Sequence, residues 1–412
     1  YSVTLVVSTF IAGLGLGNII FGWLADRVKG TFRLLVITQV CGAFLALLVS
    51  QFLGNSQFFF SKLLYIFQED FGEKVFVQFV ILFLVLIGPT IFLGAAFPLV
   101  NRIYTRSFSH IGRSIGTAYA VNIIGAILGS LVAGFVFIPL LGKENGLRIT
   151  VGLQVFLSVP ALVYLKVKAG KKIHAFTMGS IALALSLLLL ISFPSWDHNS
   201  LSRGGYYRFD GIKQYFSTTS WFEAVWKGTS KIARQMADTE VVFYGDGNGG
   251  FTTVEKWVNP TGTANYYLIN RGNRDATSHS DRLTRALSAH IPLLFHADPE
   301  KVMVLGLSSG MIPGETLLYP VKQLDVLEIN DQVIKAAEFF TPWNNNFFTH
   351  PNTRMIVQDG RNHLELTDET YDVIISDPSN PWMAGIANLF TLEYFKTVKG
   401  HLNGDGIFII CT

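Results

Sequence analysis

The sequence predicts a polytopic α-helical membrane domain followed by an α/β domain with a parallel sheet. Half of the 412 residues are hydrophobic and 15% are charged, and the apolar residues are concentrated before residue 194. This distribution is typical of a membrane protein with an attached soluble domain. After residue 300, short apolar runs alternate with isolated glycines and acids, which is typical of an open α/β sheet.

Six apolar segments in the first 193 residues reach the roughly 20 residues that a helix needs to cross a bilayer. They cover residues 3–24, 32–53, 75–100, 114–141, 149–166 and 174–193. We therefore expect residues 1–193 to form a six-helix transmembrane domain in contact with membrane lipids.

Basic residues are concentrated in the loops after the first, third and fifth spans. These residues are Arg27, Lys29, Arg33, Arg102, Arg106, Arg113, Lys166, Lys168, Lys171 and Lys172. Because lysine and arginine are retained on the cytoplasmic side, the odd-numbered loops are expected to be cytoplasmic. Six crossings then place the chain from residue 194 onward on the non-cytoplasmic, periplasmic side. Since the basic residues lie between apolar spans and form no basic stripe, no nucleic-acid partner is expected.

Residues 194–240 form a connecting segment without clear periodicity, and a small antiparallel sheet is expected in residues 241–280. The runs 241–244, 251–254 and 264–269 are typical of strands, and the glycine-rich stretch 245–250 predicts a hairpin between the first two. An amphipathic helix then begins at Ser280–Asp281 and runs through His290, and Pro292 is expected to end it.

The α/β domain is expected over residues 281–412, with four strands that each end in a glycine or an acid. The run 302–305 leads into a glycine turn from Gly306 to Gly310, whose backbone amides can face a ligand. Three further strand-like runs, 324–328, 354–358 and 371–376, bring Glu328, Asp359–Gly360 and Asp377 to strand ends. In an open α/β sheet these ends meet at one crevice, where an acid such as Glu328 faces ribose hydroxyls.

Two further expectations concern the chain ends and the cysteines. The sequence starts at Tyr1, and Thr412 interrupts the strand-like run 406–410, so we expect a fragment whose α/β domain is incomplete at its C-terminal end. Cys41 and Cys411 have apolar neighbours and no CxxC spacing. Neither a disulfide nor a metal site is therefore expected.

The order of these features resembles the spermidine/spermine synthase family of polyamine aminopropyltransferases. The features are a small β-sheet, a helix ending in the motif from His290 to Pro292, and the four strand ends. The apolar N-terminal half is similar to that of a subgroup in which membrane spans are fused to a spermidine synthase. The resemblance implies a class I methyltransferase-like (Rossmann-type) fold.

The resemblance also implies roles for individual residues. The glycine turn would cradle the nucleoside, Glu328 would bind the ribose hydroxyls, and Asp359 would bind the adenine edge. Asp377 matches the family's catalytic acid, which holds or deprotonates the attacking amine. The implied cofactor-binding residues are Gly306, Ser309, Gly310, Glu328, Asp359 and Gly360.

The amine-binding half of the family's site is altered in this sequence. Ser309 stands where the family has an Asp that holds the donor's ammonium, and Asn380 replaces the second Asp of a DSTDP-type motif. Asp275 falls at a Gln position, and the run 284–286, Thr-Arg-Ala, replaces a Tyr and its acidic or Gln neighbours. The expected substrate-binding residues are Asp275, Asn380 and Trp382, the last in a loop that closes the site in the family.

These exchanges change the kind of substrate that the pocket favours. A diamine carries two positive charges that need fixed carboxylates, because an unpaired buried ammonium costs several kcal/mol. Two acids have become neutral and an arginine has been added, so a neutral or anionic group is favoured there.

The sequence thus predicts a membrane-anchored, aminopropyltransferase-type transferase with an altered polyamine site. Its donor would be a sulfonium nucleoside, either decarboxylated S-adenosylmethionine or S-adenosylmethionine itself. The alternative is a non-catalytic pseudoenzyme that acts as a structural or interaction subunit of a membrane complex. The lost carboxylates and the expected non-cytoplasmic location, which has no obvious donor supply, both favour that alternative.

Overall fold

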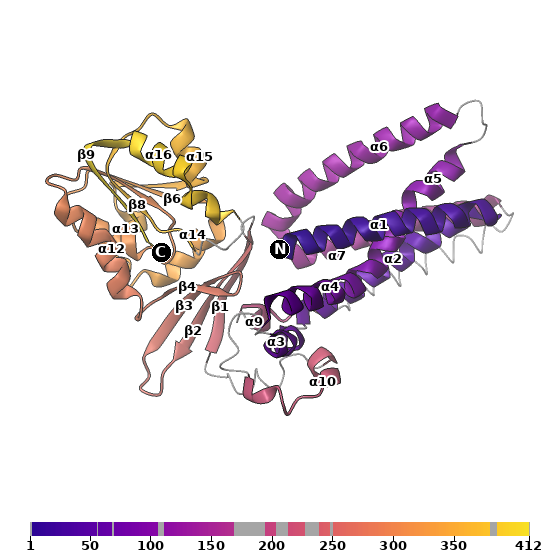
Figure 1. The fold of residues 1–412 in the computed structure, drawn as a ribbon, viewed down its shortest axis with the longest axis horizontal. Coiled ribbons are helices and arrows are strands. Elements are labelled where there is room, and N and C mark those ends of the chain that lie inside the picture. The colour runs from indigo at the N-terminus through magenta and orange to yellow at the C-terminus, as the bar shows by residue number, and fades with distance from the viewer. Residues whose placement is uncertain are drawn as a thin grey trace. The chain divides into compact units, whose positions relative to one another are not determined.

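The computed structural model describes residues 2–55, 57–67, 70–105, 111–168, 194–202, 213–226, 239–247, 250–379 and 385–411. The chain divides into two compact units (Figure 1). The first contains Tyr1–Asp197 and Arg208–Thr229, and the second contains His198–Tyr207 and Ser230–Thr412.

The first unit is helical. Its elements are α1 (Ser2–Arg27), α2 (Thr31–Asn55), α3 (Gln57–Ile66), α4 (Phe71–Gly94), α5 (Ala96–Tyr104), α6 (Ile111–Val132), the π-helical turn η2 (Ala133–Phe137), α7 (Ile138–Lys168), η3 (Lys213–Tyr215) and α10 (Trp221–Trp226). Within the described ranges, four helical stretches are long and apolar enough to cross a membrane, namely Val3–Arg27, Thr31–Asn55, Phe71–Tyr104 and Ile111–Ser158.

The predicted spans map onto these helices with one difference. The first three lie within separate helical stretches, whereas the fourth and fifth lie in the single run that spans α6, η2 and α7. That run is interrupted at Gly142, whose φ of 77° and ψ of 168° are not helical. A glycine adopts a positive φ without steric cost, so the run bends at the point where the fourth predicted span ends. The sixth predicted span, 174–193, lies outside the described residues.

Close backbone approach and polar contacts hold the first unit together. A Cβ atom on Gly17 of α1 would lie 2.1 Å from the carbonyl oxygen of Ile91 in α4, so the two helices touch without an intervening side chain. Gln154 Nε2 of α7 donates to Gln39 Oε1 of α2 at 3.1 Å. After α7, the backbone amide of Trp196 donates to Glu144 at 3.1 Å.

The second unit begins with a four-stranded antiparallel sheet in the order β1-β2-β3-β4. It contains β1 (Thr239–Gly247), β2 (Gly250–Val258), β3 (Ala264–Asn270) and β4 (Asn273–Thr277), and the short helix α9 (His198–Ser202) belongs to the same unit. The first three strands confirm the sequence prediction, while β4 was not predicted because its residues 273–275 are all polar. Arg271 and Gly272 join β3 to β4 with φ values of 52° and 82°, as in a two-residue hairpin turn.

A five-stranded parallel sheet follows, in the order β7-β6-β5-β8-β9. Its strands are β5 (Lys301–Leu305), β6 (Gln323–Glu328), β7 (Thr353–Val357), β8 (Tyr371–Ser376) and β9 (Leu402–Ile410). The helical elements of this part are α12 (Arg282–Phe295), α13 (Met311–Thr316), α14 (Asp331–Ala337), η4 (Glu338–Phe340), η5 (Phe347–Thr349), α15 (Gly360–Leu366), η6 (Ile386–Phe390) and α16 (Leu392–Gly400). The four strands predicted around the crevice are confirmed, and the architecture is a Rossmann-type sheet.

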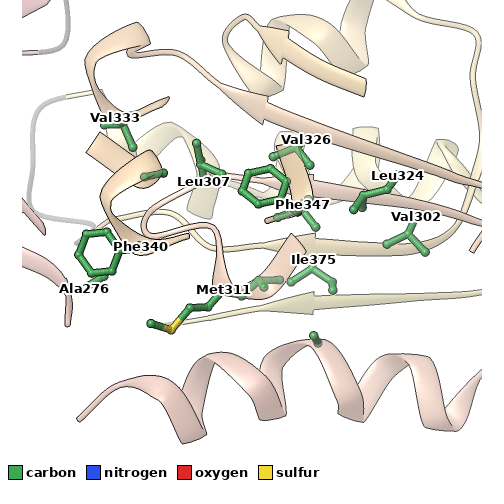
Figure 2. Close-up of a cluster of buried hydrophobic side chains, with 14 of the residues drawn as sticks. Ala276, Val302, Leu307, Met311, Leu324, Val326, Val333, Phe340, Phe347 and Ile375 are labelled. Atoms are coloured by element: carbon green, nitrogen blue, oxygen red, sulfur yellow. The ribbon is translucent and has the colours of Figure 1, made fainter. Parts of the chain in front are cut away.

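Side chains that point alternately to the two faces of the central strands fill two hydrophobic cores, one on each face of the parallel sheet. Val302 and Val304 of β5 join one cluster with residues of α12, α13 and α14 (Figure 2). Met303 and Leu305 of the same strand join the other cluster with residues of α15 and α16. Strands buried on both faces read as continuous apolar runs, which is why they were visible in the sequence.

The helix before the parallel sheet corrects one prediction. Pro292 does not end it, because α12 continues to Phe295. Pro292 and Leu293 are both buried, so packing against the core compensates for the backbone hydrogen bond that a proline cannot donate.

A buried carboxylate ties three strands together away from the crevice. Asp325 of β6 is fully buried and accepts hydrogen bonds from Arg354 Nε and Nη2 of β7 at 2.9 and 2.6 Å. It also accepts one from the Tyr371 hydroxyl of β8 at 2.8 Å. The bidentate arginine and the tyrosine compensate for burying the charge.

The close approach of Gly314 to Asn344 predicts a position at which alanine is not tolerated. A Cβ atom on Gly314 of α13 would lie 2.1 Å from the carbonyl oxygen of Asn344, so backbone must move to admit it. We expect Gly314→Ala to lower the stability of the second unit by about 1–3 kcal/mol. Gly400→Ala at the end of α16, where nothing lies within 4 Å, is the control and should be neutral or slightly stabilising. Thermal unfolding of the whole chain in detergent measures both, and equal midpoints for the two variants would contradict the packing.

Candidate functional site

The carboxyl ends of β5 and β8 lie side by side where the strand order reverses. From β5 the chain steps outward to β6 and β7, and then returns past β5 to β8 and β9. The amide of Asp377 donates to the Leu305 carbonyl at 2.7 Å, and the amide of Gly306 donates to the Leu327 carbonyl at 2.9 Å. Open α/β sheets bind ligands at this kind of switch point.

Gly306 permits this approach. Its φ is 91°, and a Cβ atom on it would lie 2.4 Å from the carbonyl oxygen of Asp377. Any other residue would be strained in that conformation and would push the loop after β8 away. The predicted glycine and the predicted acid are therefore neighbours through their backbones.

The glycine turn after β5 holds two hydroxyl groups without partners among the described residues. Ser308 has a φ of 50° and Gly310 a φ of 79°, so the backbone reverses sharply before α13. Ser308 Oγ and Ser309 Oγ are both buried and receive no hydrogen bond from the part of the chain that the structure describes. Asn344 Nδ2 fixes the turn by donating to the Ser309 carbonyl at 3.1 Å. Buried hydroxyls without partners are uncommon, and at a strand end they are suited to a polar ligand group.

Glu328 links the ends of β5 and β6. Its Oε2 accepts from the backbone amide of Leu307 in the glycine turn at 3.1 Å, and its Oε1 accepts from the backbone amide of Asn330 at 2.8 Å. Burial raises the pKa of Glu328 to about 7, although the two amides oppose that rise. The carboxyl group is thus held in a fixed orientation beside the turn and titrates near neutral pH.

Asp359 and Gly360 lie at the end of β7, and each has a structural task. Asp359 Oδ1 caps α15 by accepting from the amide of Asn362 at 3.0 Å. A Cβ atom on Gly360 would lie 2.0 Å from Leu305 Cδ2, so the glycine makes room for a core side chain of β5. The position of Asp359 at a strand end agrees with its predicted place.

Asp377 forms a buried ion pair with Arg285 of α12. Arg285 Nη1 donates to Asp377 Oδ2, and the two side chains are 17% and 6% exposed. Arg285 Nη2 donates to the backbone carbonyl of Asp275 at 2.7 Å. Burial raises the pKa of Asp377, and the guanidinium opposes that rise. Burial alone would lower the pKa of Arg285, but the Asp377 carboxylate raises it above its ordinary value.

Asp275 of β4 is the second acid of this cluster. Its Oδ2 accepts from Asn270 Nδ2 of β3 and from Ser379 Oγ, the latter at 3.1 Å. Burial raises the pKa of Asp275, and these two hydrogen bonds oppose the rise.

A chain of side-chain hydrogen bonds runs from the loop after β6 to Asp275. Asn330 Nδ2 donates to Thr252 Oγ1 of β2 at 3.0 Å, and Thr252 Oγ1 donates to Asn270 Oδ1 at 2.7 Å. Asn270 then donates to Asp275. Because the amide of Asn330 also binds Glu328, the antiparallel sheet connects the Glu328 side of the crevice to the Asp377 side.

The structure brings most of the predicted site residues to one edge of the parallel sheet. Gly306, Ser309, Gly310, Glu328, Asp359, Gly360 and Asp377 all lie at or just after the carboxyl ends of β5 to β8, and Asp275 lies against them through Ser379 and Arg285. Asn380 and Trp382 lie outside the described residues, so their predicted roles stay predictions.

Sequence reasoning did not include several residues of this cluster in the site. The sequence indicates Arg285 as a replacement but not its contact with Asp377, and it does not place Asn270, Thr252 or Ser379 in the site. The added positive charge at Arg285 beside lost carboxylates was the only signal. Among the described residues, no group of three His, Cys, Asp or Glu side chains could hold a metal ion.

Comparison with known proteins supports the family resemblance for the C-terminal part of the chain. Residues 283–412 match the family model described as the spermine/spermidine synthase domain. The polyamine aminopropyltransferase of Bacillus cytotoxicus is 32% identical over 146 residues, which are 35% of this chain and 53% of that protein. The polyamine aminopropyltransferase of Bacillus subtilis is 33% identical over 138 residues, 33% of this chain and 50% of that protein. The chain thus spans about half the length of the curated relatives that it matches.

Solved structures of spermidine synthases are also similar. A crystal structure of spermidine synthase in complex with the transition state analogue AdoDATO has 24% identity and a TM-score of 0.38, and the match covers 41% of this chain and 57% of that one. Spermidine synthase from Thermotoga maritima has 24% identity and a TM-score of 0.36, with 41% and 56% covered.

The raised pKa of Glu328 predicts a pH dependence of stability. An acid whose pKa is higher in the folded protein than in the unfolded chain, where it is 4.5, binds its proton more tightly when folded. Its contribution to stability is complete below about pH 4.5 and is lost as the pH rises to about 7, a change of about 3 kcal/mol at most. Glu328→Gln cannot titrate, so the stability of the variant relative to the unmutated protein should increase between pH 5 and pH 8.

The measured quantity is the slope, against pH, of the stability difference between Glu328→Gln and the unmutated protein. The glutamine amide also disturbs the contact with Leu307 or Asn330, but this effect does not depend on pH and so does not change the slope. Thermal unfolding of both proteins at several pH values measures it. Glu338→Gln, at an exposed position of η4, is the matched control and should show no slope. A difference for Glu328→Gln that is constant with pH would show that Glu328 titrates normally.

Proposed function

We propose, from the family match of residues 283–412, that this chain binds a sulfonium nucleoside and is an aminopropyltransferase-type transferase with an altered acceptor site. The observation that carries the proposal is the convergence of the glycine turn, Glu328 and Asp377 at the switch point of a sheet that lies within the matched residues. The two curated relatives are named polyamine aminopropyltransferases, which supports this class of reaction for the proposal.

The nucleoside would lie along the ends of β5, β6 and β7. Glu328 is held by two backbone amides and keeps further lone pairs for the two ribose hydroxyls. Asp359 uses Oδ1 for the helix cap, and its Oδ2 can accept from the exocyclic amine of adenine. The unpartnered hydroxyls of Ser308 and Ser309 lie where the turn would face the charged end of the donor.

The transfer itself needs a nucleophile and a place for its proton. The acceptor's lone pair attacks the methylene carbon bonded to the sulfonium sulfur, a new bond to carbon forms, and the carbon–sulfur bond breaks with its electron pair staying on sulfur. Methylthioadenosine leaves as a neutral thioether, and the proton of the acceptor passes to the Asp377 carboxylate. The same attack uses decarboxylated S-adenosylmethionine or S-adenosylmethionine as the donor.

One observation favours a non-catalytic alternative. The carboxyl group that would serve as base is already paired with Arg285, which engages one of its oxygens. A domain that binds a nucleoside without transferring a group would act as an interaction subunit in a membrane complex. Turnover of the donor to methylthioadenosine distinguishes the two functions.

We further propose that the helical unit anchors the chain in a membrane, as in membrane-fused members of the family. Four described stretches are long and apolar enough to cross a bilayer. No residue of α6 is buried within the described chain, and large apolar side chains such as Ile124, Leu128 and Leu131 are exposed on it. Lipid contact would explain an apolar helix with no buried face.

Titration with methylthioadenosine tests the nucleoside site. We expect calorimetry on the whole chain in detergent to show saturable binding, and we expect Asp359→Ala to weaken it about tenfold to a hundredfold because one hydrogen bond to a charged group is lost. No heat at about 1 mM ligand would contradict the proposal.

Asp359→Asn separates binding from helix capping. Asparagine caps a helix as well as aspartate, so this variant should keep the stability that Asp359→Ala loses, about 1 kcal/mol. Like Asp359→Ala, it should bind methylthioadenosine only weakly. The asparagine uses its oxygen for the cap, so its NH2 group, a donor, faces the adenine amine, which is also a donor. If Asp359→Asn binds as tightly as the unmutated protein, Asp359 only caps α15.

A reporter fusion tests the predicted orientation. Six crossings would place residue 200 on the non-cytoplasmic side, so alkaline phosphatase fused after residue 200 should be active and the same enzyme fused after residue 30 should be inactive. Activity only in the second fusion would overturn the orientation and would place the α/β unit beside a cytoplasmic donor supply.

A further inference from the structure

We infer that Arg285 determines acceptor specificity by supplying, from the protein itself, the cation that a polyamine would bring to Asp377. The acceptor pocket would then take a nucleophile borne on an uncharged or anionic group, and it would exclude a diamine. This inference rests on the proposed transferase function, whose donor site lies at other strand ends.

The geometry places the guanidinium where the ammonium of a polyamine acceptor would need to bind before it loses its proton and attacks. Asp377 is the matched catalytic acid, and Arg285 Nη1 donates directly to its Oδ2. The second nitrogen, Nη2, donates to the carbonyl of Asp275 in β4 at 2.7 Å, so β4 and the loop after β8 together orient one planar group. Since both partners of the ion pair are largely buried, at 17% and 6% exposure, the arginine cannot swing into solvent without leaving a buried carboxylate unpaired.

Asp275, the second acid of the cluster, does not have both carboxylate oxygens free to bind another ammonium. Asp275 Oδ2 already accepts from Asn270 and from Ser379. Its pKa is raised by burial, so a second fixed negative charge is disfavoured there. A diamine with two positive charges would find Asp377 already ion-paired with Arg285, and Asp275 already hydrogen-bonded to the side chain of Asn270.

Asp281 is a further acid that acts electrostatically on both partners of the ion pair, whereas Cys411 and Ser288 near it are small and neutral. Cys411 Sγ donates to Ser288 Oγ of α12 at 3.3 Å, and both Asp377 and Arg285 act electrostatically on that thiol. Ser379 completes the neutral set on the side of Asp275. Arg285 uses one N–H for each of its two partners and has five in all, so it retains donors for a carboxylate on the acceptor.

Removal of the arginine should turn the pocket into a cation site. Arg285→Ala leaves the Asp377 carboxylate buried and unpaired beside the space that the side chain occupied. An amine of suitable size would restore the lost charge pairing. The unmutated chain should not bind such an amine, because its own guanidinium is already there.

The test is titration of the whole chain in detergent with 1,4-diaminobutane alone, without donor, at constant ionic strength. We expect Arg285→Ala to bind the diamine at least about thirtyfold more tightly than the unmutated chain does, by calorimetry and by a rise in the thermal midpoint. Arg282→Ala, an exposed arginine on the same helix, is the matched control and should behave like the unmutated chain. Arg285→Lys keeps a cation in place and should also exclude the diamine.

Equal diamine affinity in Arg285→Ala and the unmutated chain would overturn the inference. Should Arg285→Ala fail to fold, Arg285→Met removes the charge while filling much of the volume and gives the same readout. Methylthioadenosine binding, measured in the same samples, reports on the proposed function separately. If the unmutated chain does not bind methylthioadenosine, the proposed function is contradicted. The comparison of diamine binding between the variants alone decides the role of Arg285.

Discussion

The contact between the backbones of Gly306 and Asp377 is the constraint on which the rest of the site depends. Two parallel strands end together there, with the Asp377 amide bonded to Leu305 at 2.7 Å and no room for a side chain on Gly306. The turn that follows Gly306 presents the Leu307 amide to Glu328, and the loop that follows Asp377 presents Ser379 to Asp275. A single close approach therefore positions the acids on both sides of the crevice.

Two buried aspartates on the same sheet show how differently one side-chain type is used. Asp325 is surrounded by donors from Arg354, Gln323 and Tyr371, so its charge is fully compensated and its effect is to hold β6, β7 and β8 together. Asp377 lies at the opposite, carboxyl ends of the strands and has one described side-chain partner, Arg285. Because Asp377 has so few partners, it keeps lone pairs with which it can accept a hydrogen bond or a proton from a ligand, whereas those of Asp325 are occupied.

The Glu328 side and the Asp377 side of the crevice differ in the ligand groups that they could bind. On the side of Glu328, two backbone amides orient the carboxyl group, and the buried hydroxyls of Ser308 and Ser309 have no partner among the described residues, which suits the proposed nucleoside. On the side of Asp377, the fixed Arg285 guanidinium balances the charge of the carboxylate. The family match of residues 283–412 supports the proposed reaction class, and the Arg285–Asp377 pair is the basis for the proposal that the acceptor is not a polyamine.

Local patterns in the sequence were sufficient for the four strands around the crevice, the glycine turn and the acids at strand ends. Strands buried on both faces give apolar runs, and turns after them need glycine, so both signals are contained in a few adjacent residues. The partners of those acids were decided only by the tertiary structure. Arg285 and Asp377 are 92 positions apart, and Asn330 and Thr252 are 78 apart, so no local pattern connects them. Strand β4 was also invisible, because its polar residues become a strand only by pairing with β3. The sequence by itself therefore determined which strand ends carry the candidate site, and packing decided which charged side chains meet there.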